Sequence, residues 1–95
     1  MITIPLRAIP NQRFSFAHGQ DRWVIEIKVA IESMICNLWL NDSPVLMGTR
    51  IVAGVPIIWT PRLAVNGNFG IITEGDDEPW WQLFETSQRL VYWND

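Results

Sequence analysis

The sequence predicts an all-β protein, a single small antiparallel β-sandwich or barrel of about seven short strands, and three observations favour this class. Apolar and polar residues alternate with a period of two along most of the chain, as they do in half-buried strands. Turn-forming Gly, Pro, Asn and Asp recur between these runs. A chain of 95 residues supports one core, so we expect one β domain over residues 1–95.

The clearest strand lies between Trp23 and Ile31. Its odd-numbered residues are all apolar, whereas the even-numbered ones include Glu26 and Lys28. Residues 12–18 alternate in the same way, and a short glycine-containing loop separates the two runs. Together they predict an antiparallel hairpin with one buried face.

The remaining elements follow from shorter patterns. Strands are expected over residues 34–40, 45–55 with an extension to 59, 63–65, 69–72 and 89–93. The pair Asn66-Gly67 predicts a hairpin turn between two of them, and Gly48 and Gly54 are each expected to mark a bulge or a close approach of the backbone. Helix is limited to at most one short turn near residues 79–87, where Pro79 suits a first helical position.

Composition and charge exclude several classes of protein. Hydrophobic residues make up 48% and charged residues 18%, which is too apolar for an intrinsically disordered chain. The net charge of −3 lacks the basic surface that binds phosphate backbones, so we expect no nucleic-acid partner. The apolar runs are far shorter than the ~20 residues of a membrane span, and residues 1–7 lack a signal-peptide pattern. We therefore expect no membrane association.

Catalytic chemistry has few candidate residues in this chain. The single cysteine, Cys36, is expected to be a buried strand residue, and the single histidine, His18, lies near a predicted hairpin loop. One Cys and one His cannot form a zinc site, and the sequence contains no phosphate-binding loop or nucleophile elbow. We expect no catalytic residue, no cofactor and no enzymatic activity.

An acidic loop is the one candidate for binding a metal ion. It contains four carboxylates, from Glu74, Asp76, Asp77 and Glu78. Carboxylate oxygens bind calcium, but their spacing does not match the EF-hand pattern. A solvated acidic turn is favoured, and no metal site is predicted.

The unusual feature of the composition is its six tryptophans. Four fall in predicted strands, and Trp80-Trp81 lie beside the acidic loop. One small core is not expected to enclose all six rings together with four phenylalanines. Exposed aromatic rings are typical of protein interfaces and of sugar-binding surfaces, so we expect some tryptophans to contact another molecule.

Several short motifs, in order along the chain, resemble those of a known family. They are Ile4-Pro5-Leu6, Pro10-Asn11-Gln12 with Phe14, Leu38-Trp39-Leu40, the turn Asn41-Asp42-Ser43-Pro44, Gly48, Asn66-Gly67, a late acidic loop containing proline, and Leu90-Val91-Tyr92. This set and the length resemble the small baseplate plug proteins of contractile-tailed bacteriophages. The segment from Pro56 to Pro61, which contains Trp59, departs from that pattern.

The resemblance implies a structural protein of the virion, located in the tail baseplate and made in the host cytoplasm. It implies contacts with tube, hub and wedge proteins, in several copies with three- or six-fold symmetry. It implies no active-site residues.

The residues themselves suggest where such contacts would form. The segment Ile2–Leu6 is a candidate N-terminal arm within residues 1–7, because an extended arm can add a strand to an open sheet edge. Together with the aromatic surface this gives seven interface candidates: Ile4, Pro5, Leu6, Trp59, Trp80, Trp81 and Trp93.

Two other functions fit parts of the same pattern. A carbohydrate-binding module would need coplanar, exposed Trp80 and Trp81 with polar neighbours such as Asp76, Asp77 and Gln82. An OB-like binder of single-stranded nucleic acid would use the aromatic residues, but the seven basic residues are spread along the chain and predict no positive groove.

Overall fold

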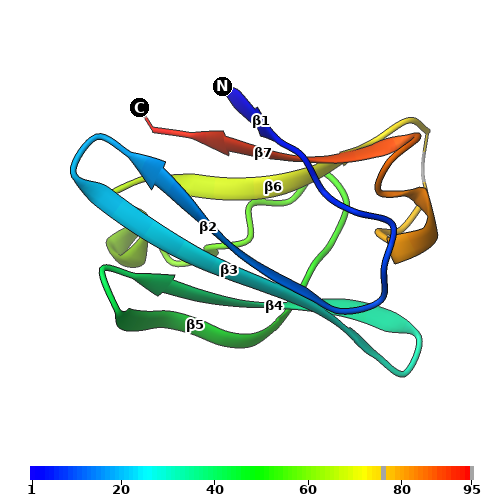
Figure 1. The fold of residues 1–95 in the computed structure, drawn as a ribbon, viewed down its shortest axis with the longest axis horizontal. Coiled ribbons are helices and arrows are strands. Elements are labelled where there is room, and N and C mark those ends of the chain that lie inside the picture. Colours follow the sequence, from blue (N-terminus) through cyan, green and yellow to red (C-terminus); the bar gives the residue numbers. More distant parts are fainter. Residues whose placement is uncertain (76, 95) are drawn as a thin grey trace.

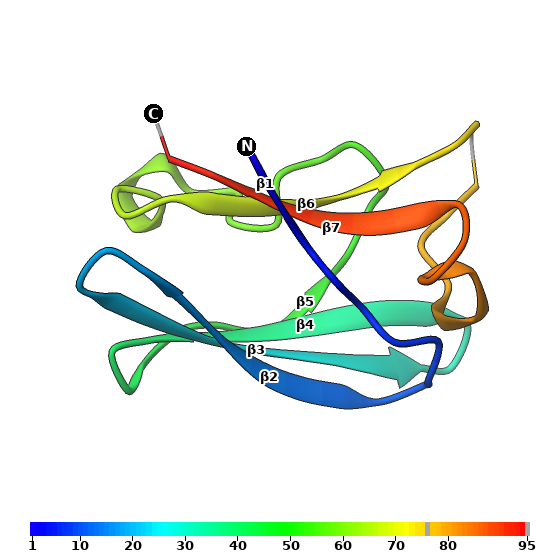
Figure 2. The ribbon, with the colours of Figure 1, turned by 45° about the horizontal axis from the view of Figure 1, so that its top comes forward.

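Two antiparallel sheets stack face to face in the computed structural model, which describes residues 1–75 and 77–94 (Figures 1 and 2). One sheet has three strands in the order β1-β7-β6, and the other has four in the order β2-β3-β4-β5. The strands are β1 (Ile2–Ile4), β2 (Gln12–His18), β3 (Asp21–Ala30), β4 (Ser33–Leu40), β5 (Ser43–Arg50), β6 (Asn68–Thr73) and β7 (Gln88–Trp93). The predicted all-β class and its seven strands are confirmed for the described residues.

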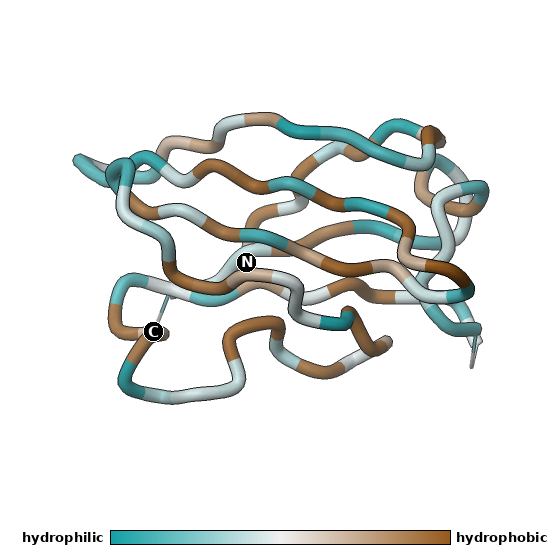
Figure 3. Tube along the Cα trace, turned by 90° about the horizontal axis from the view of Figure 1, so that it is seen from below, coloured by the Kyte–Doolittle hydropathy of each residue, from teal (hydrophilic) through white to brown (hydrophobic). Residues whose placement is uncertain are grey.

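The core lies between the two sheets, because alternate side chains of each strand point inward. Hydrophobic and hydrophilic residues alternate along the strands in Figure 3. Trp23, Ile25 and Ile27 of β3 are fully enclosed there, as the period of two predicted. Aromatic rings join the layers: Trp23 meets Phe69 of β6 edge-on, with the ring centroids 5.0 Å apart. The sandwich is therefore held by one shared apolar interior.

Tight turns connect β2 to β3, β3 to β4 and β4 to β5. The β4–β5 turn, Asn41-Asp42, has positive φ at both residues, which suits the right-handed twist of a hairpin. The β3–β4 turn corrects one expectation. Ile31 was expected on the buried face of its strand, but it lies in the turn with φ of 61° and is 95% exposed.

A bulge in β5 forms at Gly48, which is one of the two alternatives that the sequence predicted for this glycine. The pairing between β4 and β5 shifts register near Leu38, and Gly48 adopts a φ of 67°. Its N–H donates to the Asn37 Oδ1 over 2.6 Å. Glycine suits this position because other residues rarely adopt such a φ.

The long connection between β5 and β6 differs from the prediction. The expected strand over residues 45–55 ends at Arg50, and residues 63–65 form no strand. Pro61–Leu63 instead form a single 3-10 turn, η1, so the predicted Asn66-Gly67 hairpin is wrong.

The physical reason is that residues 54–58, rather than 63–65, occupy the free edge of β6. The Gly54 N–H donates to the Ile71 carbonyl over 3.0 Å, and the Ile57 N–H donates to the Phe69 carbonyl over 2.8 Å. The backbone groups on this edge of β6 are thereby satisfied by an irregular segment.

The connection between β6 and β7 contains the predicted short helical turn. This turn, η2 (Trp81–Leu83), begins two residues after Pro79. The buried Gln88 side chain anchors the loop, since it accepts a hydrogen bond from the Trp80 N–H over 2.8 Å and donates to the Glu78 carbonyl over 2.9 Å. No helix in the described ranges is long and apolar enough to cross a membrane.

Candidate protein interface

The six tryptophans divide into three groups by exposure. Trp23 is fully enclosed in the core, and Trp59 is 71% exposed. The others are half-buried: Trp39, Trp80, Trp81 and Trp93. Indole surface therefore remains uncovered in the isolated chain.

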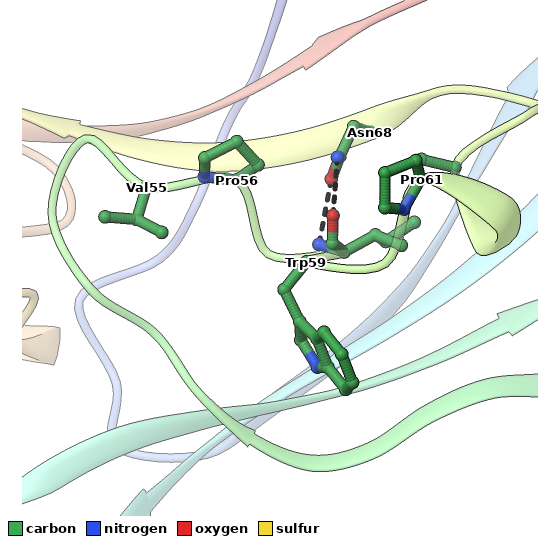
Figure 4. Close-up of a pocket in the computed structure, with 7 residues that line it drawn as sticks. Val55, Pro56, Trp59, Pro61 and Asn68 are labelled. Atoms are coloured by element: carbon green, nitrogen blue, oxygen red, sulfur yellow. Dashed lines mark hydrogen bonds between the residues drawn. The ribbon is translucent and has the colours of Figure 1, made fainter.

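Trp59 projects from the segment that lies beside β6, away from that strand (Figure 4). The preceding residue is held by the buried Asn68 side chain, whose Oδ1 accepts from the Ile58 N–H and whose Nδ2 donates to the Ile58 carbonyl, each over 2.9 Å. This double hydrogen bond fixes the backbone next to Trp59. A hollow of about 520 Å³ lies beside the indole and is lined by residues including Pro56 and Pro61.

Part of the outward face of the three-stranded sheet, around Gly70, Val91 and Trp93, is also apolar, whereas Thr3 and Arg89 are polar residues of the same face. Val91 points outward on β7, between the inward-facing Leu90 and Tyr92, yet it is only 2% exposed. The Trp93 ring lies over Gly70, where a Cβ atom would be 3.4 Å from the ring. The solvent side of an antiparallel sheet is usually polar, so this face is atypical of a surface that only meets water.

Three hollows on this side of the molecule adjoin one another. The hollow beside Trp59 and a second one, of about 220 Å³, share Val55 and Pro56, and the second also contacts Trp93. A third, of about 140 Å³, contacts Trp93 and Asn68. None of the described side chains that line the three hollows is charged.

We call this surface the outer apolar face. It is defined by Met1, Val55, Pro56, Trp59 and Trp93. Met1 is 82%, Trp59 71% and Val55 46% exposed, so apolar surface of this face is exposed on several segments at once. Contiguous exposed apolar surface is a feature of protein interaction sites.

The sequence missed part of this surface. Val55 stood at the end of a predicted strand, over residues 45–55. The available signal was the cluster of Gly54, Pro56 and Pro61, which interrupts a strand and leaves apolar residues outside a ladder.

The N-terminal candidates are packed on their own chain. Residues 2–4 pair with β7 as strand β1, and Ile4 and Leu6 are each only 6% exposed. Pro5 between them is exposed. Of these three candidates, Pro5 alone offers substantial surface to another molecule in this conformation.

The Trp80-Trp81 pair does not form the flat platform expected for stacking on a sugar. The two ring planes are inclined by 41°, and both rings are half-buried against the core. Asp77 and Gln82 are exposed nearby, and Asp76 lies outside the described residues. The pair therefore packs against the core at one end of the sandwich.

The titratable candidates are involved in packing. Cys36 is fully enclosed, and burial raises the pKa of its thiol to about 12, so the nucleophilic thiolate is disfavoured. His18 packs its ring edge-on against Tyr92, with the centroids 5.0 Å apart. Burial also raises the pKa of Tyr92, whose hydroxyl donates to the Asn66 carbonyl over 2.8 Å.

Among the described residues no group of His, Cys, Asp or Glu is arranged to hold a metal ion.

Comparison with known proteins identifies a family for this sequence. No curated relative matches the chain. The sequence does match, over residues 1–95, the family model described as cyanophage baseplate Pam3 plug gp18. The match covers the whole length and agrees with the resemblance carried by the ordered motifs and turns. The chain belongs to the cyanophage baseplate Pam3 plug gp18 family.

Proposed function

We propose that this protein is a non-enzymatic structural subunit that joins tube, hub and wedge proteins in the tail baseplate. The family supports a structural role in the baseplate. The outer apolar face supports the finer proposal, because several exposed apolar residues there need a partner to cover them. The chain is made in the host cytoplasm and enters the baseplate in several copies, with three- or six-fold symmetry.

The observation that carries this proposal is the exposure of Trp59 beside a hollow with no charged lining. Its indole is 71% exposed, although the backbone next to it is held rigidly by Asn68. Large aromatic side chains on a rigid support are typical interface anchors, because little conformational entropy is lost when they bind. Pro5 and the exposed parts of Trp80, Trp81 and Trp93 extend the candidate contact surface.

A double substitution, Trp59→Ser with Val55→Ser, tests the role of this face. Both side chains are exposed, so the free variant is expected to keep its thermal stability and circular dichroism spectrum. Loss of an anchor residue costs ~2 kcal/mol or more, which corresponds to roughly a 30-fold weaker contact. We expect the amount of variant recovered in purified baseplates, after complementation of a phage lacking this gene, to fall at least ~10-fold.

Ile31→Ser is the matched control. Ile31 is an exposed apolar residue on the β3–β4 turn and does not belong to the outer apolar face. It is expected to assemble as the wild type does. Equal recovery of the double variant and the wild type would show that this face joins no partner.

A further inference from the structure

Two of the four lateral edges of the sheets are closed by features of the chain itself. On the β5 edge, Pro44 lacks an N–H and the bulge at Gly48 interrupts the strand. Proline and bulges of this kind protect edge strands from pairing with other chains. The outer edge of β6 is covered by residues 54–58, which bond to it directly.

The β1 edge also offers little backbone for pairing with another strand. This strand has three residues and is followed by Pro5. Strand β2 differs from all of them, because it runs for seven residues without proline or glycine and pairs with β3 in unbroken register. Figure 2 shows β2 at the outer margin of its layer.

The register identifies which backbone groups on β2 point outward. His18 and Asp21 close a two-residue turn and form a hydrogen-bonded pair, so the residues facing β3 alternate from His18 along the strand. The N–H and C=O groups of Arg13, Ser15 and Ala17 therefore face away from β3. No hydrogen bond to these groups from another segment is found among the described residues.

The side chains of β2 determine what would fit beside it. Phe14 and Phe16 point into the sandwich but stay half-buried at its margin, and Phe16 contacts Tyr92 at 5.0 Å between centroids. Arg13 is exposed on the opposite side and lies over the Trp39 ring at 4.8 Å. An added strand would cover the phenylalanines on one face and meet a cation on the other.

We propose that β2 accepts an extended strand from a different baseplate protein, which adds to the four-stranded sheet as a fifth strand. This inference rests on the proposed function. The strand carries apolar side chains at every second position, against Phe14 and Phe16, and an acidic residue opposite Arg13. A different chain is favoured because a three- or six-fold ring of copies joined edge to edge needs two open edges per subunit, whereas β2 is the one open edge among the described residues.

Hydrogen exchange tests the added strand directly. In the free protein, the amides of Arg13, Ser15 and Ala17 are expected to exchange rapidly. In purified baseplates the peptide covering residues 12–18 is expected to exchange at least ~10-fold more slowly, because an added strand occupies these donors. Unchanged exchange of this peptide in baseplates would overturn the proposal.

Cross-linking identifies the source of the strand. Ser15→Cys introduces an accessible thiol on β2, and the native Cys36 is fully enclosed and does not compete. A photo-reactive maleimide on this thiol is expected to yield, in baseplates, an adduct with a different protein. Ser43→Cys, exposed on the closed β5 edge, is the matched control and is expected to give little of that adduct. An adduct between two copies of this chain would overturn the choice of partner.

A proline substitution separates this inference from the proposed function. Ser15→Pro removes an outward N–H without breaking a bond to β3, whereas Ser15→Thr keeps that N–H. Provided that both variants fold, we expect Ser15→Pro to reduce recovery in baseplates at least ~10-fold and Ser15→Thr to match the wild type. If the Trp59 and Val55 variant is lost from baseplates while Ser15→Pro assembles normally, the β2 proposal fails and the proposed function stands.

Discussion

At the scale of single residues, Cys36 shows how the fold changes the chemistry of a side chain. Its thiol is enclosed between the sheets, and desolvation, with a smaller effect from the Glu26 carboxylate, raises its pKa from 9.0 to about 12. The unfolded chain therefore releases this proton at a lower pH than the folded protein does. The resulting stabilisation is complete below pH 9, where the thiol stays protonated in both states, and is lost as the pH rises towards 12.

This difference predicts that stability falls with rising pH in the alkaline range. Each such group lowers the free energy of unfolding by up to ~1.4 kcal/mol per pH unit. The raised pKa of Tyr92 acts in the same direction. Urea unfolding at about pH 8 and about pH 10.5 measures the loss, and Cys36→Ala is expected to show a smaller loss between the two pH values. An equal pH dependence in that variant would contradict the assignment.

At the scale of secondary structure, the hairpins differ in how well their turns suit the residues present. Asn41 and Asp42 adopt positive φ in the β4–β5 turn, as these residue types do readily. Ile31 adopts a φ of 61° in the β3–β4 turn, where a β-branched residue is strained. The turn is thus imposed by the register of the strands on either side, and a residue without a Cβ would suit it better.

Replacement of Ile31 by glycine is therefore expected to stabilise the protein. Relief of ~1–2 kcal/mol of strain exceeds the entropic cost of a glycine, for a net gain of ~0.5–1 kcal/mol. For a domain of this size the melting temperature should rise by roughly 2–8 °C in differential scanning calorimetry. Glu32→Gly, at the neighbouring turn residue without positive φ, is the control and is expected to give no gain. A lower melting temperature for Ile31→Gly would refute the strain argument.

At the scale of the whole molecule, the two sheets are stabilised by one interior. Phe69 of the three-stranded sheet contacts Trp23 of the other edge-on, and its ring is also 5.0 Å from that of Tyr92. The buried apolar residues of both layers belong to one cluster in the described structure. We therefore expect the sheets to unfold together.

Phe69→Ala tests this cooperativity. Removal of the buried ring should lower the free energy of unfolding by ~3–5 kcal/mol. Far-ultraviolet circular dichroism and tryptophan fluorescence should still report one coincident transition in urea. Val65→Ala, which shortens an exposed side chain, is the control and should change stability by less than ~0.5 kcal/mol. Two separate transitions would contradict a shared core.

The strands with continuous alternation of apolar and polar residues could be predicted from the sequence. Residues 12–18 and the odd-numbered residues from Trp23 to Ile27 reveal their inward face directly, because side chains alternate across a strand. The bulge at Gly48 and the enclosure of Cys36 were predictable for the same local reason. The exposure of some indole surface followed from the number of tryptophans and the size of one core.

Which segments lie beside one another could not be predicted in this way and is seen in the tertiary structure. Residues 54–58 cover β6 because the Asn68 side chain bonds the Ile58 backbone, a contact that no local pattern reveals. The same packing exposes Trp59, encloses Ile4 and Leu6, and leaves β2 as the open edge. Alternation specifies which face of a strand is buried, whereas the pairing of distant segments depends on the combined burial and hydrogen bonding of the whole chain.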